Sequence, residues 1–296
     1  MNDRPIDSAT DSPTDLKERA SMKEAIEKSD LATENVAEAQ FILSCIDLTD
    51  LSDDLSRTDI ERLCARADTP HGPVAAVCLK PRFVDIAFEH LRHNTIRIAT
   101  VINFPDGDGD RERIIHQAVD LVNAGAQELD LVFPYEDFLA GREEKVRHLL
   151  DSCRQAVGSD ITLKIIMETA AFNDHNTLRR AADLALMSGC DFLKTSTGQY
   201  SGGGATLETS AVLLQAIRER ESDSNSSVPV GFKASGGIRT LKGAVQFKTV
   251  VAEMMGEEWL NPHLFRVGAS MLLDDILGCL NPGSDKKIEE NIESSY

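Results

Sequence analysis

The sequence has few cysteines, no long apolar run and no segment rich in lysine or arginine. Its six cysteines form no C-x-x-C pair and its seven histidines show no zinc-ligand spacing, so neither a disulfide scaffold nor a zinc site is indicated. No apolar run approaches the roughly 20 residues of a membrane-spanning helix, and the first residues lack the apolar core of a signal peptide. These absences predict a cytoplasmic protein with reduced thiols and no membrane partner.

The charge balance is strongly acidic, with a formal net charge of -18. Phosphate backbones repel such a surface, so a nucleic-acid partner is not expected. At 296 residues, 42% of them hydrophobic, the chain can bury a large core. This length suits one large α/β domain or two smaller ones, and composition does not choose between them.

Residues 1–40 are polar and rich in charge, and we interpret them as an acidic extension that is partly disordered or helical. The stretch from Asp15 to Ala39 carries a thin apolar stripe that includes Leu16, Met22 and Ile26, which is compatible with one exposed helix. We favour a solvated extension over a helix that docks on the rest of the chain.

From residue 41 onward, short apolar runs recur about every thirty residues, with amphipathic stretches between them. The runs that we expect to be strands are Ile42–Leu48, Val74–Leu79, Ile96–Phe104, Glu128–Phe133, Ile161–Met167, Cys190–Lys194, Val228–Phe232 and Leu264–Val267. Strands that alternate with helices in this number predict a (β/α)8 TIM barrel over residues 41–281. The competing doubly wound sheet typically has a Gly-x-Gly-x-x-Gly turn after its first strand, which Asp47-Leu48-Thr49-Asp50-Leu51 does not resemble.

The ends of these runs carry an unusual set of polar and ionisable residues. They are Asp47, Cys78, Asn103, Asp130, Glu168, Lys194, Lys233 and Gly268-Ala269-Ser270. In a TIM barrel the active site lies at the carboxyl ends of the strands, so these side chains converge on one place. A structural ion pair explains any one of these charges, but it explains the whole set poorly.

Two of the strand ends are lysines followed by small residues, Lys194 before Thr195-Ser196-Thr197-Gly198 and Lys233 before Ala234-Ser235-Gly236-Gly237. Burial disfavours an ammonium and lowers the pKa of a lysine, which makes its amine a nucleophile near neutral pH. The pair suggests Schiff-base chemistry on a phosphorylated carbonyl compound.

Several segments are similar to the deoxyribose-phosphate aldolase family, class I aldolases with a (β/α)8 fold. The segments are Cys45-Ile46-Asp47-Leu48-Thr49, Pro81-Arg82-Phe83, Ala99 to Pro105, Glu128 to Tyr135, Asp191 to Gly198, Val230 to Arg239, Phe265 to Ser270 and Ser294-Ser295-Tyr296. The resemblance covers roughly residues 41–296. It implies reversible cleavage of 2-deoxy-D-ribose 5-phosphate to acetaldehyde and D-glyceraldehyde 3-phosphate, without a metal or other cofactor.

The resemblance assigns roles to individual residues. Lys194 matches the lysine that forms the imine, and Lys233 matches a second lysine whose charge lowers the pKa of the first. Asp130 matches the acid/base carboxylate that works through a water, and Lys164 matches a lysine beside it. Tyr296 matches a mobile C-terminal tyrosine that transfers a proton at the methyl carbon of acetaldehyde, so residues 282–296 are expected to form a mobile tail.

A further set of residues is expected to bind the substrate. Its members are Asp47, Thr49, Thr197, Gly198, Gly236, Gly237 and Ser270. We expect the glycines after Lys233 to offer backbone N–H groups to the phosphate at a helix N-terminus. The expected partners are a phosphorylated sugar and short aldehydes, and the family suggests a homodimer.

Two departures from the family pattern concern the phosphate. Gln199 stands where the family usually has a lysine, and Met271 stands where a small hydroxyl residue is common. Both predict weaker phosphate binding. The alternatives to the deoxyribose-phosphate reaction are therefore a related Schiff-base aldolase with an altered aldehyde or phosphate preference, and a non-catalytic barrel used as a binding scaffold.

Overall fold

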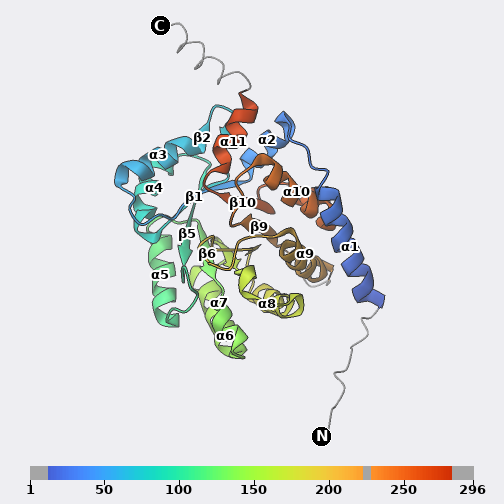
Figure 1. The fold of residues 1–296 in the computed structure, drawn as a ribbon. Coiled ribbons are helices and arrows are strands. Elements are labelled where there is room, and N and C mark those ends of the chain that lie inside the picture. Colours follow the sequence, from blue (N-terminus) through green and yellow to red (C-terminus); the bar gives the residue numbers. More distant parts are fainter. Residues whose placement is uncertain (1–12, 223–227, 282–296) are drawn as a thin grey trace.

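The computed structural model describes residues 13–222 and 228–281, and these fold as a barrel of strands surrounded by helices (Figure 1). The strands are β1 (Ile46–Asp50), β2 (Asp68–Thr69), β3 (Gly72–Pro73), β4 (Ala76–Leu79), β5 (Arg97–Ile102), β6 (Glu128–Val132), β7 (Thr162–Ile166), β8 (Phe192–Lys194), β9 (Gly231–Ser235) and β10 (Phe265–Ala269). The α-helices are α1 (Pro13–Ser29), α2 (Val36–Ser44), α3 (Arg57–Ala67), α4 (Val84–Leu91), α5 (Arg111–Asn123), α6 (Tyr135–Leu139), α7 (Glu143–Val157), α8 (His175–Met187), α9 (Leu207–Ser222), α10 (Leu241–Met255) and α11 (Leu272–Leu280). Three short 3-10 helices complete the set, η1 (Pro81–Phe83), η2 (Thr169–Ala171) and η3 (Glu257–Trp259).

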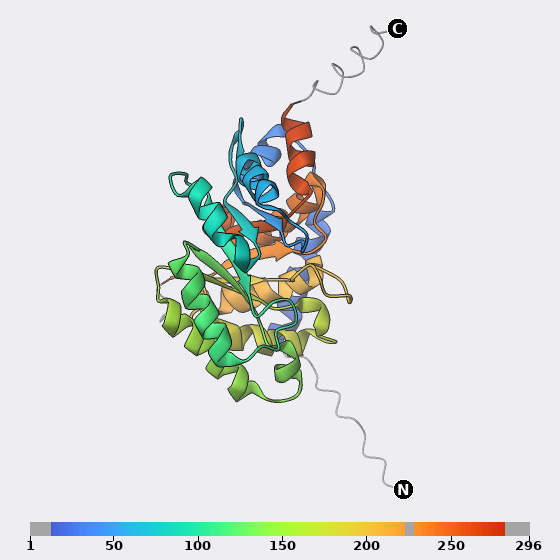
Figure 2. The same cartoon turned by 90° about the vertical axis from the view of Figure 1, so that its left-hand side faces the viewer.

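Eight of the strands close into a parallel barrel in the order β1-β10-β9-β8-β7-β6-β5-β4. The helices that follow the strands pack around the outside, as the two perpendicular views show (Figure 2). The predicted (β/α)8 architecture is thereby confirmed. The small antiparallel pair β2-β3 lies outside the barrel sheet, and the sequence reasoning did not foresee it.

Two predicted strands are displaced along the chain. The run Ile42–Leu48 is wrong at its start, because residues 42–44 end helix α2, where Ala39, Ile42 and Leu43 are buried at helical spacing. The run Val228–Phe232 is wrong in both bounds, because β9 begins only at Gly231. Its first residues include a proline, which has no N–H to donate to a sheet.

The displaced bounds change the position of two expected site residues. Asp47 is the second residue of β1, and Lys233 is the third residue of β9, so neither closes its strand. Both side chains are fully buried inside the barrel. The strand ends proper are Asp50 and Ser235.

Helix α1 packs against the barrel, contrary to the expected solvated extension. It runs along α10 and α9 at the outer edge of the molecule (Figure 1), and Ala25 is 2% exposed. Lys28 forms an ion pair with Glu253 of α10 at 2.6 Å. The expected boundary at residues 40 and 41 falls inside helix α2. Residues 1–12 lie outside the described part of the chain.

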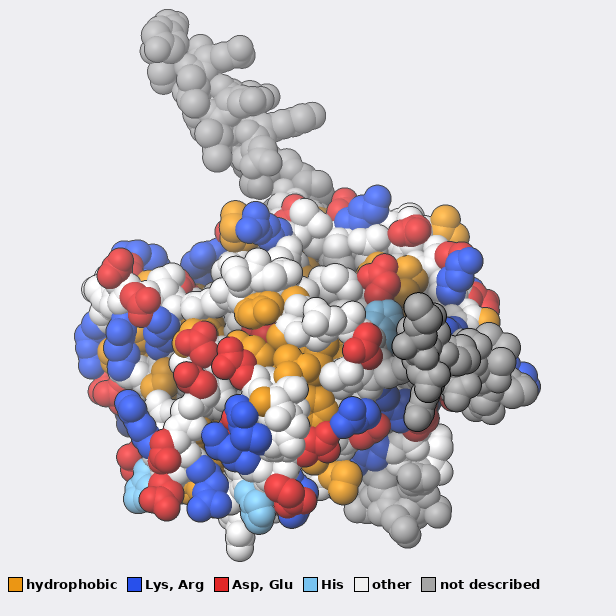
Figure 3. Space-filling model, turned by 60° about the horizontal axis from the view of Figure 1, so that its bottom comes forward, with side chains coloured by type: hydrophobic (Ala, Val, Ile, Leu, Met, Phe, Trp, Pro, Cys, Tyr) orange, Lys and Arg blue, Asp and Glu red, His pale blue; other side chains and the backbone are white. Residues whose placement is uncertain are grey.

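The surface carries interspersed charges of both signs. Lys and Arg side chains alternate with Asp and Glu over the face in Figure 3. Many of them pair within one helix, as Arg147 does with Glu144 at 2.6 Å. Exposed pairs of this kind contribute about 0–1 kcal/mol each, so the stability of the fold depends on its core. Within the described residues, no helix is long and apolar enough to cross a membrane.

Candidate active site

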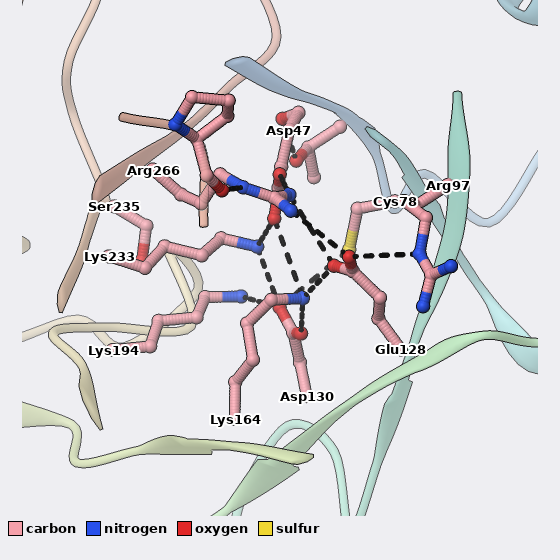
Figure 4. A network of polar contacts seen from close by, with 12 residues as sticks. Asp47, Cys78, Arg97, Glu128, Asp130, Lys164, Lys194, Lys233, Ser235 and Arg266 are labelled. Carbon is pink, nitrogen blue, oxygen red and sulfur yellow. Dashed lines mark hydrogen bonds and ion pairs between the residues drawn. The ribbon is translucent and has the colours of Figure 1, made fainter. Parts of the chain in front are cut away.

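Three lysines converge on one carboxylate inside the barrel. The Nζ atoms of Lys164, Lys194 and Lys233 lie 2.7, 2.8 and 2.8 Å from the carboxylate oxygens of Asp130 (Figure 4). The three lysines come from β7, β8 and β9, in chain order, and Asp130 comes from β6. Each of the four residues is at most 3% exposed. Strand pleating explains the convergence, because the ladder pairs Asp130 with Lys164 and Lys194 with Lys233 on neighbouring strands.

The ionic cluster continues toward the amino ends of the strands. Arg266 of β10 donates to Asp47 at 2.6 Å and to Glu128 at 3.1 Å, and Glu128 also contacts Lys164. Sequence reasoning missed Glu128 and Arg266. Alternation along β6 could have found Glu128, which stands two residues before Asp130 and therefore faces the same side. Arg266 is the register partner of Lys233, but that pairing is visible only in the folded sheet.

The buried members of this cluster include one more cation than carboxylates. The buried cations are Lys164, Lys194, Lys233 and Arg266, and the carboxylates are Asp47, Glu128 and Asp130. Arg97, which is 39% exposed, contacts Glu128 at 3.6 Å from the solvent side and adds to the excess of positive charge. Burying an uncompensated charge is costly, so the interior favours losing one proton. The group that loses it is the cation with the fewest carboxylate partners.

Lys194 is that group. It contacts Asp130 alone, whereas Lys233 contacts both Asp47 and Asp130, and Lys164 has three carboxylate partners. The number of carboxylate partners thus distinguishes Lys194 from Lys164 and Lys233.

The directions of the pKa shifts separate Lys194 from the other two lysines in the same way. Burial lowers the pKa of Lys194 below its usual value, and the charge of Lys233 lowers it further, while Asp130 opposes both effects. Burial acts in the same direction on Lys164 and Lys233, but their carboxylates outweigh it and raise the pKa of both. Lys194 is therefore the amine that is most easily deprotonated.

Asp130 remains ionised at the centre of the cluster. Burial alone would raise the pKa of this carboxyl, but Lys164, Lys194 and Lys233 outweigh burial and hold it well below its usual range. Cys78 of β4 lies 4.0 Å from the same carboxylate, and burial raises the pKa of its thiol. Cys78 is therefore a neutral neighbour of the cluster in the interior, and Leu79, not Cys78, closes β4.

A cavity of about 360 Å³ opens above Lys194 at the carboxyl ends of the strands. Six other residues that were expected at the site line it, namely Thr49, Thr197, Gly198, Gly236, Gly237 and Ser270. Asp47 was expected to bind the substrate, but it lies below the cavity with its carboxylate oxygens bound to Lys233 and Arg266. Tyr296 lies outside the described residues.

The glycine turn after β9 does not form a helix N-terminus, contrary to expectation. Helix α10 begins at Leu241, and its first N–H groups already bind Asp275, Glu34 and Thr240. The turn itself remains open to the cavity. Within the described chain, the N–H groups of Gly237 and Ile238 donate to no backbone acceptor, so they are available to an anion.

Of the two departures from the resemblance, Gln199 lines the cavity, whose cationic lining residues are Lys194 and Arg239. Met271 follows Ser270, is 59% exposed and is not a lining residue of the cavity. No group of three histidine, cysteine or acidic side chains within the described residues could hold a metal ion.

A barrel with a buried lysine below an open cavity at the carboxyl ends of its strands defines the class of (β/α)8 barrel enzymes. Comparison with known proteins narrows this class. The profile of the DeoC/LacD family aldolase matches residues 41–277, so the chain belongs to the DeoC/LacD family of aldolases.

The relatives agree with this assignment. A deoxyribose-phosphate aldolase from Agrobacterium fabrum is 41% identical over 250 residues, which cover 84% of this chain and 94% of the relative. A solved Toxoplasma gondii ME49 structure described as a deoxyribose-phosphate aldolase has a TM-score of 0.77 at 23% identity, covering 83% of this chain and 94% of that one. A Coccidioides immitis structure with the same description has a TM-score of 0.69 at 25% identity, covering 86% and 96%.

Proposed function

We propose that this enzyme is a class I aldolase that reversibly cleaves 2-deoxy-D-ribose 5-phosphate to acetaldehyde and D-glyceraldehyde 3-phosphate. The single observation that carries the proposal is the position of Lys194, which among the buried lysines of the described residues has one carboxylate partner and lines the cavity. Membership of an aldolase family and the name of the 41% identical relative point to the same reaction.

The first step uses the amine of Lys194. Its neutral form attacks the C1 aldehyde of the open-chain sugar and forms a C–N bond, and the resulting carbinolamine loses water to give a protonated imine. The proton that Lys194 must lose beforehand leaves from an atom already within 2.8 Å of Asp130. Lys233 keeps its charge and disfavours reprotonation of its neighbour.

The carbon–carbon step uses the imine as an electron sink. The C3 hydroxyl loses its proton, the C2–C3 bond breaks, and its electron pair moves into the imine to give an enamine, while C3 becomes the aldehyde of glyceraldehyde 3-phosphate. Protonation of the enamine and hydrolysis then release acetaldehyde and restore the amine. Asp130 holds a proton poorly because its pKa is held well below the usual range, so the C3 hydroxyl proton leaves through a water that Asp130 orients, and one proton is returned to C2 when the enamine is protonated.

The phosphate lies at the other end of the cavity. Gly198, Gly236 and Gly237 allow the backbone to approach an anion closely, and Ser270 adds a hydroxyl. Because Gln199 has no charge, Arg239 is the lining residue that would offer a positive charge to the phosphate. The assignments of Tyr296 to proton transfer and of a homodimer to the assembly remain predictions.

The test is cleavage of deoxyribose 5-phosphate by the purified full chain, followed through the acetaldehyde that is released. We expect turnover in the wild type and a loss of about 10³-fold or more in Lys194→Leu, because the nucleophile is gone. Activity is expected to survive EDTA, since the lysine supplies the electron sink. A wild type that releases no acetaldehyde, or a Lys194→Leu variant that turns over normally, would overturn the proposal.

A further inference from the structure

We propose that Glu168 is a positioning residue that fixes the phosphate-binding turn at Thr197–Gln199 relative to Lys194. This inference rests on the proposed function, but it concerns a residue to which neither the resemblance nor the mechanism above assigns a role. Glu168 follows β7 and is 1% exposed, so it lies inside the molecule beside the cavity without being part of the ionic cluster.

The hydrogen bonds of the Glu168 side chain both come from Thr197. One carboxylate oxygen, Oε2, accepts the backbone N–H of Thr197 at 3.1 Å and also its hydroxyl. The Thr197 hydroxyl oxygen in turn accepts the backbone N–H of Gln199 at 3.1 Å. Glu168 therefore holds both ends of the short turn, and the single O–H of Thr197 is committed to Glu168 instead of the substrate.

The turn has little else to hold it at this point, whereas Lys194 is held independently. The Lys194 carbonyl accepts the N–H of Met167 at 2.8 Å, and the N–H of Thr195 donates to Lys233 at 3.1 Å, as part of the sheet. β8 ends at Lys194, so residues 197–199 lie beyond the ladder. Ser235 holds Ser196 by two hydrogen bonds, and beyond it the hydrogen bonds that Glu168 accepts from Thr197 hold the turn.

Two costs at Glu168 indicate that the carboxyl itself is needed. Its backbone is left-handed, with φ at 49° and ψ at 61°, a conformation that glycine or asparagine adopts more easily. Its second oxygen, Oε1, is buried and has no hydrogen-bond partner among the described residues. Glycine at this position would avoid the backbone cost, and an apolar side chain would avoid the unpaired oxygen. The presence of a glutamate despite both costs is explained by its hydrogen bonds to Thr197.

Different parts of the structure therefore position the two sides of the cavity. The sheet places the lysine, and Glu168 places Thr197, Gly198 and Gln199, which line the cavity on the phosphate side. Loss of the Glu168 carboxyl should therefore impair use of a phosphorylated substrate while leaving imine formation with a two-carbon aldehyde intact.

The experiment compares two readouts in Glu168→Ala and Glu168→Gln. For deoxyribose 5-phosphate we expect kcat/KM to fall about 30-fold in Glu168→Ala, mainly through KM, because the turn loses its orientation. Glu168→Gln retains an acceptor oxygen for both Thr197 donors and should recover to within about threefold of wild type. Borohydride trapping of acetaldehyde on Lys194 should proceed at the wild-type rate in both variants.

Thr197→Val tests the contact from the other side. This variant removes the hydroxyl and keeps the backbone N–H, so it should reproduce part of the rise in KM, and the double variant with Glu168→Ala should be no worse than Glu168→Ala alone. Asp191→Ala is the matched control. Asp191 also accepts a backbone N–H, that of Leu163 at 2.7 Å, but at the amino end of β8, so its loss should leave KM unchanged.

The outcomes separate this inference from the proposed function. An absence of trapping and turnover in wild type would contradict the aldolase assignment. An active wild type overturns the role of Glu168 if Glu168→Ala keeps its KM, if Glu168→Gln is as impaired as Glu168→Ala, if trapping falls in parallel with turnover, or if the effects of Glu168→Ala and Thr197→Val multiply.

Discussion

At the scale of single residues, the chemistry depends on the different partners of three buried lysines. Lys194 has one carboxylate neighbour, and its pKa is lowered by burial and by Lys233, while Lys164 and Lys233 have more partners and raised pKa values. The same side-chain type is thereby a nucleophile at one position and a fixed positive charge at two others.

This difference predicts the pH dependence of imine formation. The neutral amine is the reactive form, so the rate should rise with pH through the pKa of Lys194 and level off below 10.5, the ordinary lysine value. Lys233→Met removes a like charge and frees Asp130 to stabilise the ammonium, and both effects raise the pKa of Lys194. The rising limb should then move to higher pH by about one unit. The measurement is the rate of acetaldehyde trapping against pH, and a limb that stays in place or moves to lower pH would contradict the assignment.

Gln199 carries a second prediction at this scale. Gln199→Lys places an ammonium in the cavity lining, where a charge-assisted hydrogen bond to phosphate contributes roughly 1.5–3 kcal/mol. KM for deoxyribose 5-phosphate should fall about tenfold or more, while KM for unphosphorylated deoxyribose stays unchanged. Gln155→Lys, on the exposed side of α7, adds the same charge away from the cavity and serves as control. An equal gain for both sugars, or no gain, would show that the phosphate does not lie beside Gln199.

The sequence identified most of these residues, and the exceptions have a physical cause. Lys194, Lys233 and Asp130 could be found because charged residues in short apolar runs are conspicuous. Arg266 was missed because its partners are on other strands and the pairing depends on the register of the closed sheet, whereas Glu128 could have been found by alternation along β6. Asp47 was assigned to the substrate from the family resemblance, with its strand expected to end at Leu48, whereas β1 continues to Asp50 and places Asp47 deeper in the barrel.

At the scale of secondary-structure elements, the helix before the barrel is part of the fold. Helix α1 lies against α10 and α9, and Ala25 is buried at their contact. Its sequence predicted a solvated helix because its apolar stripe is thin, and a stripe built on alanine and a few larger residues gives a weak periodic signal.

The packing of α1 can be tested by matched substitutions. Ala25→Asp buries a carboxylate with no partner and should lower the free energy of unfolding by about 2–3 kcal/mol. Ala20→Asp makes the same change on the exposed side of the helix and should cost about 0.5 kcal/mol or less. Thermal and urea unfolding of the two variants provide the comparison, with kcat unchanged in both. Equal stabilities would mean that α1 does not dock in solution.

At the scale of the whole molecule, a barrel interior that is usually apolar is filled with ion pairs. Glu128 joins Lys164 to Arg266, and Asp47 joins Arg266 to Lys233, so the cluster extends from the amino ends of the strands to the cavity (Figure 4). The alternation of apolar runs and amphipathic stretches in the sequence predicted the barrel, because each strand is followed by a helix on the outside. That alternation does not reveal which side chains fill the interior of the barrel.

Because the buried cations outnumber the carboxylates, substitutions at the two ends of this cluster should have very different effects on the free energy of unfolding. Glu128→Gln removes a carboxylate from a cluster that already has too few and should cost about 3–5 kcal/mol at neutral pH. Lys194→Met removes the excess cation and should cost about 1 kcal/mol or less, or stabilise the fold. Urea unfolding at pH 7 measures both changes. A Lys194→Met variant as unstable as Glu128→Gln would contradict the charge count.

The central claim, that Lys194 is the amine that forms the imine, is tested most directly by borohydride reduction in the presence of acetaldehyde, followed by peptide mapping. The account predicts a stable two-carbon adduct on Lys194, with Lys164 and Lys233 unmodified and no adduct in Lys194→Leu. An adduct on Lys233 in the wild type, or no adduct on any lysine, would contradict it.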